Sequence, residues 1–236
     1  MLPSSLHLIG LTIETPHPAV AAEFWANLLE RDETNHLDAP LLAGSETQVG
    51  LRFDTETDPR SGTSRVHLHV CSAVDGSQQH VVDHAVRLGA THLDVGQLPE
   101  EKHVVLADPD GNEFCVIEPE NTFLADTGVL GELACDGTRD VGVFWSKALD
   151  WPLVWDQDEE TAIQSPAGGT KIAWGGPPLE PRHGRDRQRL ELAARADRLD
   201  AEIERLLTLG ATRGESGDGW VTLFDPDGNE FRIGSE

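Results

Sequence analysis

Two histidines, one residue apart, stand in an otherwise apolar stretch of the chain. His67 and His69 alternate with Val66, Leu68 and Val70, and this period of two is typical of a β-strand whose two faces differ. Both imidazoles are therefore expected on the same face of the strand. Such a pair can chelate a divalent metal, transfer protons near neutral pH, or hydrogen-bond a ligand.

A glutamate and a cysteine share one face of a second predicted strand. Glu113 and Cys115 are two residues apart in that strand. A cysteine thiolate can ligate a metal, or act as a nucleophile when a nearby histidine lowers its pKa. The alternative is a small buried hydrophobic residue. Chemistry at this position is expected only if the strand lies beside His67 and His69.

Three landmarks occur twice along the chain, in the same order and at a nearly constant offset, which indicates an internal duplication. The repeated strings are Phe24-Trp25 with Phe144-Trp145, Leu88–Thr91 with Leu209–Thr212, and Asp108–Phe114 with Asp225–Phe231. The two copies run from Leu6 to Pro119 and from Gly128 to Glu236, so we predict domains over residues 1–119 and 128–236. A polar linker around 120–122 joins them.

Each copy reads as a strand, a helix and further strands, twice over. In the first copy we expect strands at 8–13, 47–53, 65–71, 104–106 and 114–117, and helices from residue 18 and over 75–88. Val20, Phe24 and Leu28 are expected on one face of the first helix. In the second copy Thr138 is expected to cap a helix that buries Val141, Phe144 and Ala148, and 199–207 is expected to form another helix. Gly89 and Gly210 are expected in left-handed caps, and the glycine- and proline-rich stretch 175–185 in a loop over a cavity.

The phrases Ala22-Glu23-Phe24-Trp25, Leu88-Gly89-Ala90 and Asp-Pro-Asp-Gly-Asn-Glu-Phe before a final apolar strand resemble a known family. They are similar to the glyoxalase / bleomycin-resistance / extradiol-dioxygenase superfamily, also called the vicinal oxygen chelate superfamily, and to its actinobacterial glyoxalase-like domains. The resemblance covers nearly the whole chain. It implies an α+β fold, a tandem repeat of paired β-α-β-β-β units forming cup-shaped mixed sheets, with one cup in each copy. Each cup would hold a small ligand, often over a divalent metal.

The resemblance also implies metal ligands from the first strand, from the strand that opens the second half, and from the last strand of each copy. This sequence departs from that pattern. The corresponding positions hold Leu8, Arg65 and Cys115 in the first copy, and Gln188 or Arg189 and Arg232 in the second. Because a guanidinium cannot ligate a metal, we expect no metal in the second copy, and no cofactor overall. The alternative is a divalent metal in the first copy, bound by His67 and His69 with Cys115 or Glu113.

Arg232 introduces a positive charge where the family has an acidic ligand. That charge favours an anionic or carbonyl-bearing ligand, or an internal ion pair with a carboxylate such as Glu191. Alternation places Glu191 on the same strand face as Arg189. Trp155 and Trp174 lie in predicted strands and are expected to line a cup, whereas Trp25 and Trp145 are expected in the core.

Three functions remain open. The first is a small-organic-molecule binding protein of the bleomycin-resistance type, without the usual metal. The second is a lyase, isomerase or dioxygenase, metal-dependent or metal-free, that acts on an oxygenated substrate in the cup of the first copy. The third is a regulatory module in which the second copy only completes a pseudo-dimer. Catalytic candidates are His67, His69 and Cys115, and the expected ligand-binding residues are His67, His69, Glu113, Cys115, Trp155, Trp174, Arg189, Glu191 and Arg232.

Composition narrows the partners. The 236-residue chain has a formal net charge of −24, which would be repelled by nucleic acid and by anionic membranes. Three cysteines, without a CxxC pair, argue against a disulfide framework and for a cytoplasmic protein. No signal peptide or membrane span is expected. The predicted partner is therefore a small-molecule ligand, and the predicted assembly is a monomer or a homodimer.

Overall fold

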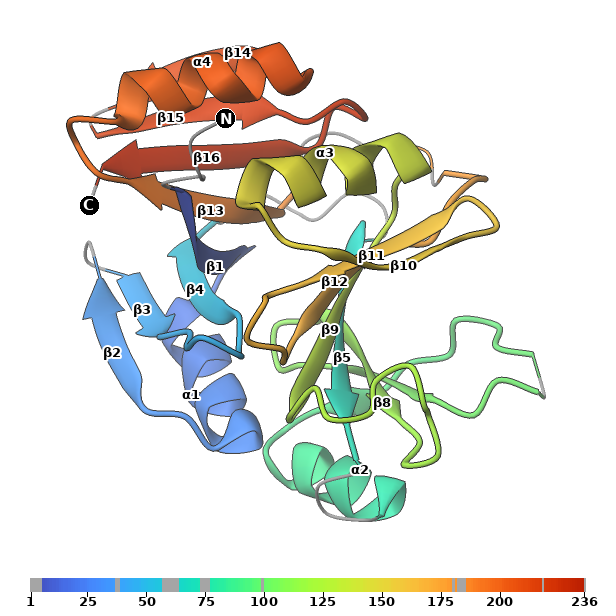
Figure 1. Ribbon diagram of the computed structural model, residues 1–236. Coiled ribbons are helices and arrows are strands. Elements are labelled where there is room, and N and C mark those ends of the chain that lie inside the picture. Colours follow the sequence, from blue (N-terminus) through green and yellow to red (C-terminus); the bar gives the residue numbers. More distant parts are fainter. Residues whose placement is uncertain are drawn as a thin grey trace.

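The computed structural model (Figure 1) describes residues 6–36, 39–56, 64–72, 77–98, 100–179, 181, 186–217 and 219–235. Within these residues the chain forms four consecutive β-α-β-β-β units, two in each sequence copy, as predicted. None of the described helices is long and apolar enough to cross a membrane.

The first copy contains two of these units. The first consists of β1 (Leu6–Thr15), α1 (Pro18–Leu29), β2 (Glu33–His36), β3 (Ala39–Leu42) and β4 (Gly50–Thr55). The second consists of β5 (Val66–Cys71), α2 (Gln78–Arg87), β6 (Thr91–His92), β7 (Val104–Ala107) and β8 (Glu113–Ile117).

The second copy repeats this plan. Its first unit consists of β9 (Leu130–Cys135), α3 (Arg139–Leu149), β10 (Leu153–Gln157), β11 (Glu160–Gln164) and β12 (Lys171–Trp174). Its second unit consists of β13 (Gln188–Ala194), α4 (Leu199–Leu209), β14 (Thr212–Gly217), β15 (Trp220–Phe224) and β16 (Glu230–Ser235).

The expectation that each copy closes its own cup is wrong. Sheet A has the strand order β14-β15-β16-β13-β1-β4-β3-β2, and sheet B the order β10-β11-β12-β9-β5-β8-β7-β6. Sheet A thus joins the outer two units of the chain, and sheet B joins the inner two (Figure 1). The central pairs are antiparallel, with Leu11 opposite Leu190 and Leu68 opposite Leu133. Because all four units begin with equivalent strands, the local sequence pattern does not show which units pair in one sheet.

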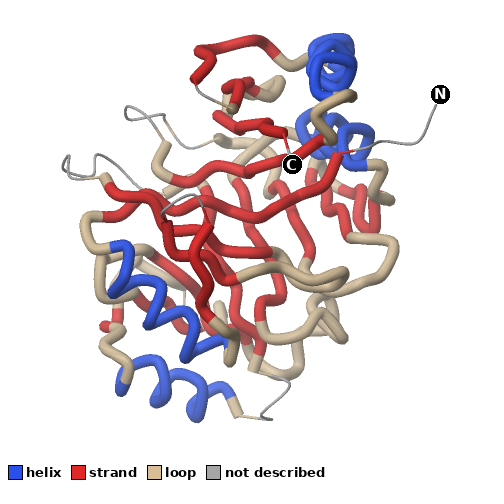
Figure 2. Tube along the Cα trace, turned by 90° about the vertical axis from the view of Figure 1, so that its left-hand side faces the viewer, coloured by secondary structure: helices blue, strands red, loops and turns tan. Residues whose placement is uncertain are grey.

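One face of each sheet is covered by helices, and these apolar faces meet in a shared core. Leu11, Ile13 and Leu190 of sheet A and Leu68 and Leu133 of sheet B belong to one buried cluster. The opposite face of each sheet, called here the cup face, carries the polar side chains that alternate with them. The tube view in Figure 2 shows strands at the centre of the molecule and helices toward its periphery.

Helix α1 buries a slightly different face from the one predicted. Phe24 and Leu28 are buried, but Val20 is 47% exposed. Ala21 and Trp25 complete the buried stripe instead, because the bulk of the indole turns the contact face toward its own side of the helix. The predicted buried residues of α3, and the core positions of Trp25 and Trp145, are confirmed.

The repeated Asp-Pro-Asp-Gly turns hold the two sheets together. In the first turn, Asp108 accepts a 3.0 Å hydrogen bond from the indole nitrogen of Trp25, on α1. Asp110 accepts hydrogen bonds from the hydroxyl of Thr15 and from the backbone nitrogen of His17, so it satisfies donors at the start of that helix. This turn belongs to sheet B, whereas α1 covers sheet A, so the motif that carries the family resemblance has a structural role.

The second turn makes equivalent contacts, but it connects sheet A with α3, the helix that covers sheet B. Asp225 accepts from the indole nitrogen of Trp145 at 3.2 Å, and Asp227 accepts from the backbone nitrogen and hydroxyl of Thr138 at 2.6 and 3.0 Å. Thr138 is the N-cap residue of α3, as predicted, but its side chain makes no capping hydrogen bond of its own. Its hydroxyl donates to the carboxylate of Asp227 instead.

Glycine occupies the positive-φ positions that the sequence predicted. Gly89 and Gly210 have φ values of 110° and 119° after α2 and α4, and Gly111 and Gly228 close the two turns at 81° and 78°. A side chain is disfavoured in this region of backbone space. Of the predicted loop 175–185, residues 180 and 182–185 lie outside the described residues, as do residues 75 and 76 of the predicted second helix.

Candidate functional sites on the two cup faces

Four side chains form a row across the cup face of sheet B, one on each of four neighbouring strands. Lys171 on β12 lies opposite Glu132 on β9, Glu132 lies opposite His69 on β5, and His69 lies opposite Cys115 on β8. We call this set the thiol row. His67 and Glu113 lie in the next row of the same face, with His67 Nε2 3.3 Å from Glu113 Oε2. The four residues that the first copy contributed to the predicted site are thus brought together.

His69 is the centre of the thiol row. Its Nδ1 lies 2.6 Å from Oε2 of Glu132, which is itself buried. Burial of the imidazole lowers its pKa, but hydrogen bonds to Cys115 and Glu132, with the charge of Glu132, outweigh this and raise the pKa to about 10. His69 is therefore an imidazolium at neutral pH, paired with a carboxylate from the other sequence copy.

The linker between the copies fills part of this cup. Leu124 is buried in an apolar cluster with Cys71, Val105, Cys115 and Ile117. The polar sequence of 120–122 predicted a simple connection, and Phe123 and Leu124 directly after it were not recognised as part of a site. Their two apolar side chains explain why the segment returns to the sheet.

Lys171 fixes this segment in place. Its ammonium group donates a hydrogen bond to the main-chain oxygen of Phe123 and lies 4.1 Å from the centre of the Phe123 ring. The ring of Trp155 meets the same phenyl group edge-on, with ring centres 5.8 Å apart. Trp155 therefore belongs to the cup of sheet B, whereas its strand β10 is otherwise largely exposed.

Trp174 lies elsewhere. It is 2% exposed and sits on the helix-covered face of β12. A Cβ atom added to Gly142 of α3 would lie 3.2 Å from its Cε3 atom, so the helix packs directly on the indole. Trp174 does not line either cup, contrary to the prediction. Alternation along β12 places its side chain on the face opposite that of Lys171.

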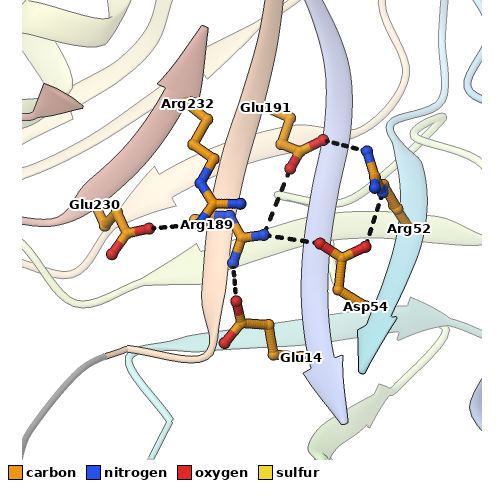
Figure 3. A network of polar contacts seen from close by, with 7 residues as sticks. All are labelled: Glu14, Arg52, Asp54, Arg189, Glu191, Glu230 and Arg232. Carbon is orange, nitrogen blue, oxygen red and sulfur yellow. Dashed lines mark hydrogen bonds and ion pairs between the residues drawn. The ribbon is translucent and has the colours of Figure 1, made fainter. Parts of the chain in front are cut away.

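The cup face of sheet A carries an ion-pair network around Arg189 (Figure 3). The Arg189 side chain is 0% exposed. It donates hydrogen bonds to Glu14 and, at 2.9 Å, to Asp54, and lies 3.6 Å from Glu191. Arg52 joins Asp54 at 2.9 Å and Glu191 at 3.4 Å. Buried charges are tolerated only when they are paired in this way.

Arg232 extends this network at its other end. Its guanidinium lies 3.6 Å from Glu230 and 4.2 Å from the ring centre of Trp220. Burial, and after it the charge of Arg189, lowers the Arg232 pKa. Arg189, Glu191 and Arg232 are thus close together, as alternation indicated, but the ion-pair partner of Arg232 is Glu230 rather than Glu191. We call Glu14, Arg52, Asp54, Arg189, Glu191, Glu230 and Arg232 the arginine network.

A hollow of about 310 Å³ lies at the end of the arginine network. Its polar border is formed by Glu14, Arg52 and Asp54, and its apolar lining by Pro18, Ala39, Pro40 and Phe53. A second cavity, between the two sheets and lined by Ser64, Arg65 and Gln188 among others, measures about 60 Å³. At roughly 30 Å³ for each water molecule, it has room for a few waters and not for an organic ligand.

The residues of the arginine network do not fit a divalent metal. In the arginine network three guanidinium groups occupy the space between the carboxylates, and a guanidinium cannot act as a ligand. In the thiol row the ammonium of Lys171 is close enough to Glu132 to interact with its charge. Among the described residues, no group of three or more His, Cys, Asp and Glu side chains is arranged to hold a metal ion.

About half of the residues in the thiol row and in the arginine network were predicted from the sequence. The prediction missed Glu132 and Lys171 on sheet B, and Glu14, Arg52 and Asp54 on sheet A. Single charged residues within buried apolar strands were the available signal, since Glu132 interrupts the apolar stretch Leu130–Cys135. They could not be joined to the predicted residues, because the partners lie in the other sequence copy.

The His69–Glu132 pair predicts a characteristic pH dependence of stability. The pKa of His69 is raised in the folded state, to about 10 against about 6.5 when unfolded. Its contribution is therefore fully present below about pH 6.5 and is lost as the pH rises toward 10. Relative to His69→Gln, the wild-type protein should lose stability across this window, by about 1.4 kcal/mol for each pH unit at most.

Urea unfolding of both proteins at several pH values measures this difference. His92→Gln, on the exposed strand β6, is the matched control and should follow the wild type at every pH. A constant difference between wild type and His69→Gln from about pH 6.5 to 10 would contradict the assignment of a charged, paired imidazole.

Comparison with known proteins agrees with this architecture. A family model described as the glyoxalase-like domain matches residues 10–117 and 132–234. No curated protein sequence matches the chain. The crystal structure of glyoxalase I from Zea mays has a TM-score of 0.66 at 12% identity, over 98% of this chain and 92% of that one. A putative dioxygenase from Bacillus subtilis has a TM-score of 0.60 at 14% identity, over 99% and 86%. At these identities the two structures share the fold, and the family match over most of the sequence shows that the chain belongs to the glyoxalase-like domain family of the vicinal oxygen chelate superfamily.

Proposed function

We propose that this protein binds a small organic molecule, neutral or cationic and carrying hydrogen-bond donors, in the hollow beside the arginine network. The observation that carries the proposal is the size and lining of that hollow. Organic ligands occupy pockets of about 300–1,000 Å³ with mostly apolar walls and a few fixed polar groups. The hollow, at about 310 Å³, lies at the lower end of this size range, and it places the polar groups of Glu14, Arg52, Asp54 and Thr55 beside Pro18, Ala39, Pro40 and Phe53.

The network supplies polar groups that are already fixed in position. Asp54 is bound by both Arg52 and Arg189, and Glu14 by Arg189. Their orientation therefore costs little additional ordering when a ligand arrives, which favours affinity.

The charge balance determines which ligand is favoured. The network contains four carboxylates and three guanidinium groups, and two of the carboxylates border the hollow. The whole chain has a formal charge of −24. The network thus keeps one carboxylate in excess within a strongly acidic chain, and an anion is disfavoured. The expectation of an anionic ligand for Arg232 is therefore replaced by a preference for an amine or a hydroxyl donor.

Three fragments with the same aromatic ring test the proposal. Benzylamine, benzyl alcohol and benzoate present a cation, a neutral donor and an anion, and ligand-observed NMR titration ranks their binding. We expect benzylamine to bind best and benzoate worst. Asp54→Asn should weaken benzylamine binding by about tenfold, because a hydrogen bond to a charged group contributes about 1.5–3 kcal/mol.

Asp197→Asn is the matched control. Asp197 is an exposed carboxylate paired with Arg195, so its replacement removes the same charge from the chain without touching the hollow. Thermal unfolding of each variant shows that it is folded. Stronger binding of benzoate than of benzylamine, or equal effects of the two substitutions, would contradict the proposed site.

A further inference from the structure

We propose that Cys115, His69 and Glu132 form a nucleophilic thiol site, which adds to small aryl-substituted α,β-unsaturated carbonyl compounds in the cup of sheet B. This site lies on the other sheet from the arginine network, and the proposal does not depend on the binding function inferred there. It concerns the thiol row, whose members come from both sequence copies.

The three side chains are arranged in the order of a nucleophile, an imidazolium and an orienting carboxylate. His69 is in register with Cys115 on one side and with Glu132 on the other. The carboxylate of Glu132 holds Nδ1 at 2.6 Å, and Cys115 contributes, with Glu132, to the raised pKa of His69. A thiol activated by a histidine that a third group orients is the general arrangement of an activated nucleophile. The thiolate, rather than the thiol, is the reactive form.

Cys71 shows what a cysteine in this cluster looks like without such partners. Cys71 and Cys115 belong to the same apolar cluster, and each is 6% exposed. The neighbours of Cys71 are the hydroxyl of Thr127 at 3.5 Å and the main-chain oxygen of Leu124 at 3.9 Å. Burial raises the pKa of the Cys71 thiol. Both thiols fill space in the core, but Cys115 stands directly opposite His69 on the neighbouring strand, whereas Cys71 follows His69 by two residues along β5.

The linker segment indicates what kind of molecule the cup accepts. The main-chain carbonyl of Phe123 takes a hydrogen bond from Lys171, its ring lies under the same ammonium group, and the edge of Trp155 adjoins it. Next to it, the aliphatic side chain of Leu124 packs in the cluster that contains Cys115. An aromatic ring, a carbonyl oxygen and an apolar group beside the thiol are thus already accommodated. A ligand that combines a ring, a carbonyl and an electrophilic carbon would satisfy the same contacts.

The dimensions agree with this class. Lys171 and Cys115 lie on strands separated by three spacings of about 4.8 Å, so their backbones are roughly 14 Å apart. Both side chains extend into the cup from opposite sides of that span. This span matches a compound with one ring and a short conjugated chain, which would take the place of Phe123 and Leu124.

The chemical step is an addition in which no atom is lost. The Cys115 thiol gives its proton to solvent, because His69 is already protonated, and the thiolate forms a carbon–sulfur bond with the β-carbon of the unsaturated carbonyl compound. The electron pair of the carbon–carbon double bond moves to the α-carbon, which takes a proton from the His69 imidazolium, and His69 regains a proton from solvent. The product is a thioether, and nothing is oxidised or reduced. Cys115 and His69 are the catalytic residues, and Glu132 is a positioning residue.

The experiment uses 4-phenyl-3-buten-2-one as the probe and its saturated analogue, 4-phenylbutan-2-one, as the control compound. Full-length protein is treated with each, digested, and analysed by mass spectrometry for adducts at Cys71, Cys115 and Cys135. We expect adducts with the unsaturated compound only, and at Cys115 at least about tenfold faster than at Cys71, since a positioned acid–base group contributes about 10²–10⁴ in rate.

Three substitutions refine the test. Leu124→Ala should speed the reaction at Cys115 by uncovering the thiol. His69→Gln should reduce the rate at Cys115 to that at Cys71. Glu132→Gln should give an intermediate rate, and Glu132→Asp should restore part of it, because a shorter carboxylate still orients the imidazole. The ratio between Cys115 and Cys71 is measured within one molecule, so partial unfolding of a variant exposes both thiols and cannot imitate a selective effect.

The outcomes that overturn the proposal are equally direct. Equal rates at Cys115 and Cys71 in the wild type would show that both are only core residues. An unchanged rate at Cys115 in His69→Gln would show that the imidazole does not activate the thiol. Absence of any adduct at Cys115, in both the wild type and Leu124→Ala, would show that the cup does not admit this class of compound.

Discussion

Replacement of Arg189 by methionine is expected to destabilise the protein by about 3–5 kcal/mol, the usual effect of removing one partner from a buried ion pair. The Arg189 side chain is fully buried and contacts Glu14, Asp54 and Glu191. Methionine has a comparable length, so the volume is largely retained while the positive charge is lost. Three carboxylates then remain close together on a poorly hydrated face, with Arg52 as the nearest remaining cation.

Arg232→Met is the matched control, because it removes the same charge from the same network at a more hydrated position. The Arg232 side chain is 23% exposed and its ion-pair distance to Glu230 is 3.6 Å. Its loss should cost about 1 kcal/mol or less, apart from the contact with Trp220. Urea unfolding of both variants gives the two free energies. Similar losses of unfolding free energy in the two variants would show that the contribution of Arg189 to stability does not depend on its burial. The network would then act as a set of surface ion pairs.

The duplication and the order of elements could be predicted because both are local properties of the sequence. The turn that ends in Glu113-Phe114 is repeated in full, and the apolar periodicities of α3 and β5 follow from residues a few positions apart. The buried positions of Trp25 and Trp145 followed for the same reason. Local patterns also placed His67 and His69 on one face of β5, since alternation along a strand requires no knowledge of the neighbouring strand.

The assembly of the sheets could not be predicted in this way. A strand such as β1 presents the same kind of edge to β13 as it would to β5, because the two partners are copies of one ancestral sequence. The choice is determined by long-range packing, including the contacts of the Asp108 and Asp225 turns with the helices on the other sheet. Each cup therefore contains residues from both copies, and half of each site was assigned to the wrong partners or missed.

This exchange of units also explains why the linker has a function beyond connection. The second copy begins with β9, which must lie beside β5 in the centre of sheet B. The chain from the end of β8 therefore crosses the cup of that sheet before it enters β9, and Phe123 and Leu124 pack there. No equivalent segment of the described chain is found on sheet A, whose two halves are the first and last units of the sequence.

Separation of the chain into its two sequence copies provides a test of this architecture. We expect residues 1–119, expressed alone, to give no folded monomer. Both β1 and β5 would lose their central partners, β13 and β9, and each would present a long unpaired edge next to an exposed apolar face. Such edges pair with other chains or aggregate. The fragment should therefore be insoluble, or should dimerise through the edges that the second copy normally occupies.

Co-expression of 1–119 with 120–236 should restore a soluble one-to-one complex, because every strand then regains its partner and only one peptide bond is missing. Size-exclusion chromatography with light scattering measures the composition, and amide hydrogen exchange reports on β1 and β5. Slow exchange in these two strands is expected in the complex and in the intact chain, but not in the isolated fragment. A fragment 1–119 that is monomeric, soluble and protected in both strands would mean that each copy can close its own cup. The pairing of outer with outer and inner with inner units would then be one of two arrangements open to this sequence, and the joint sites built from both copies would lose their structural basis.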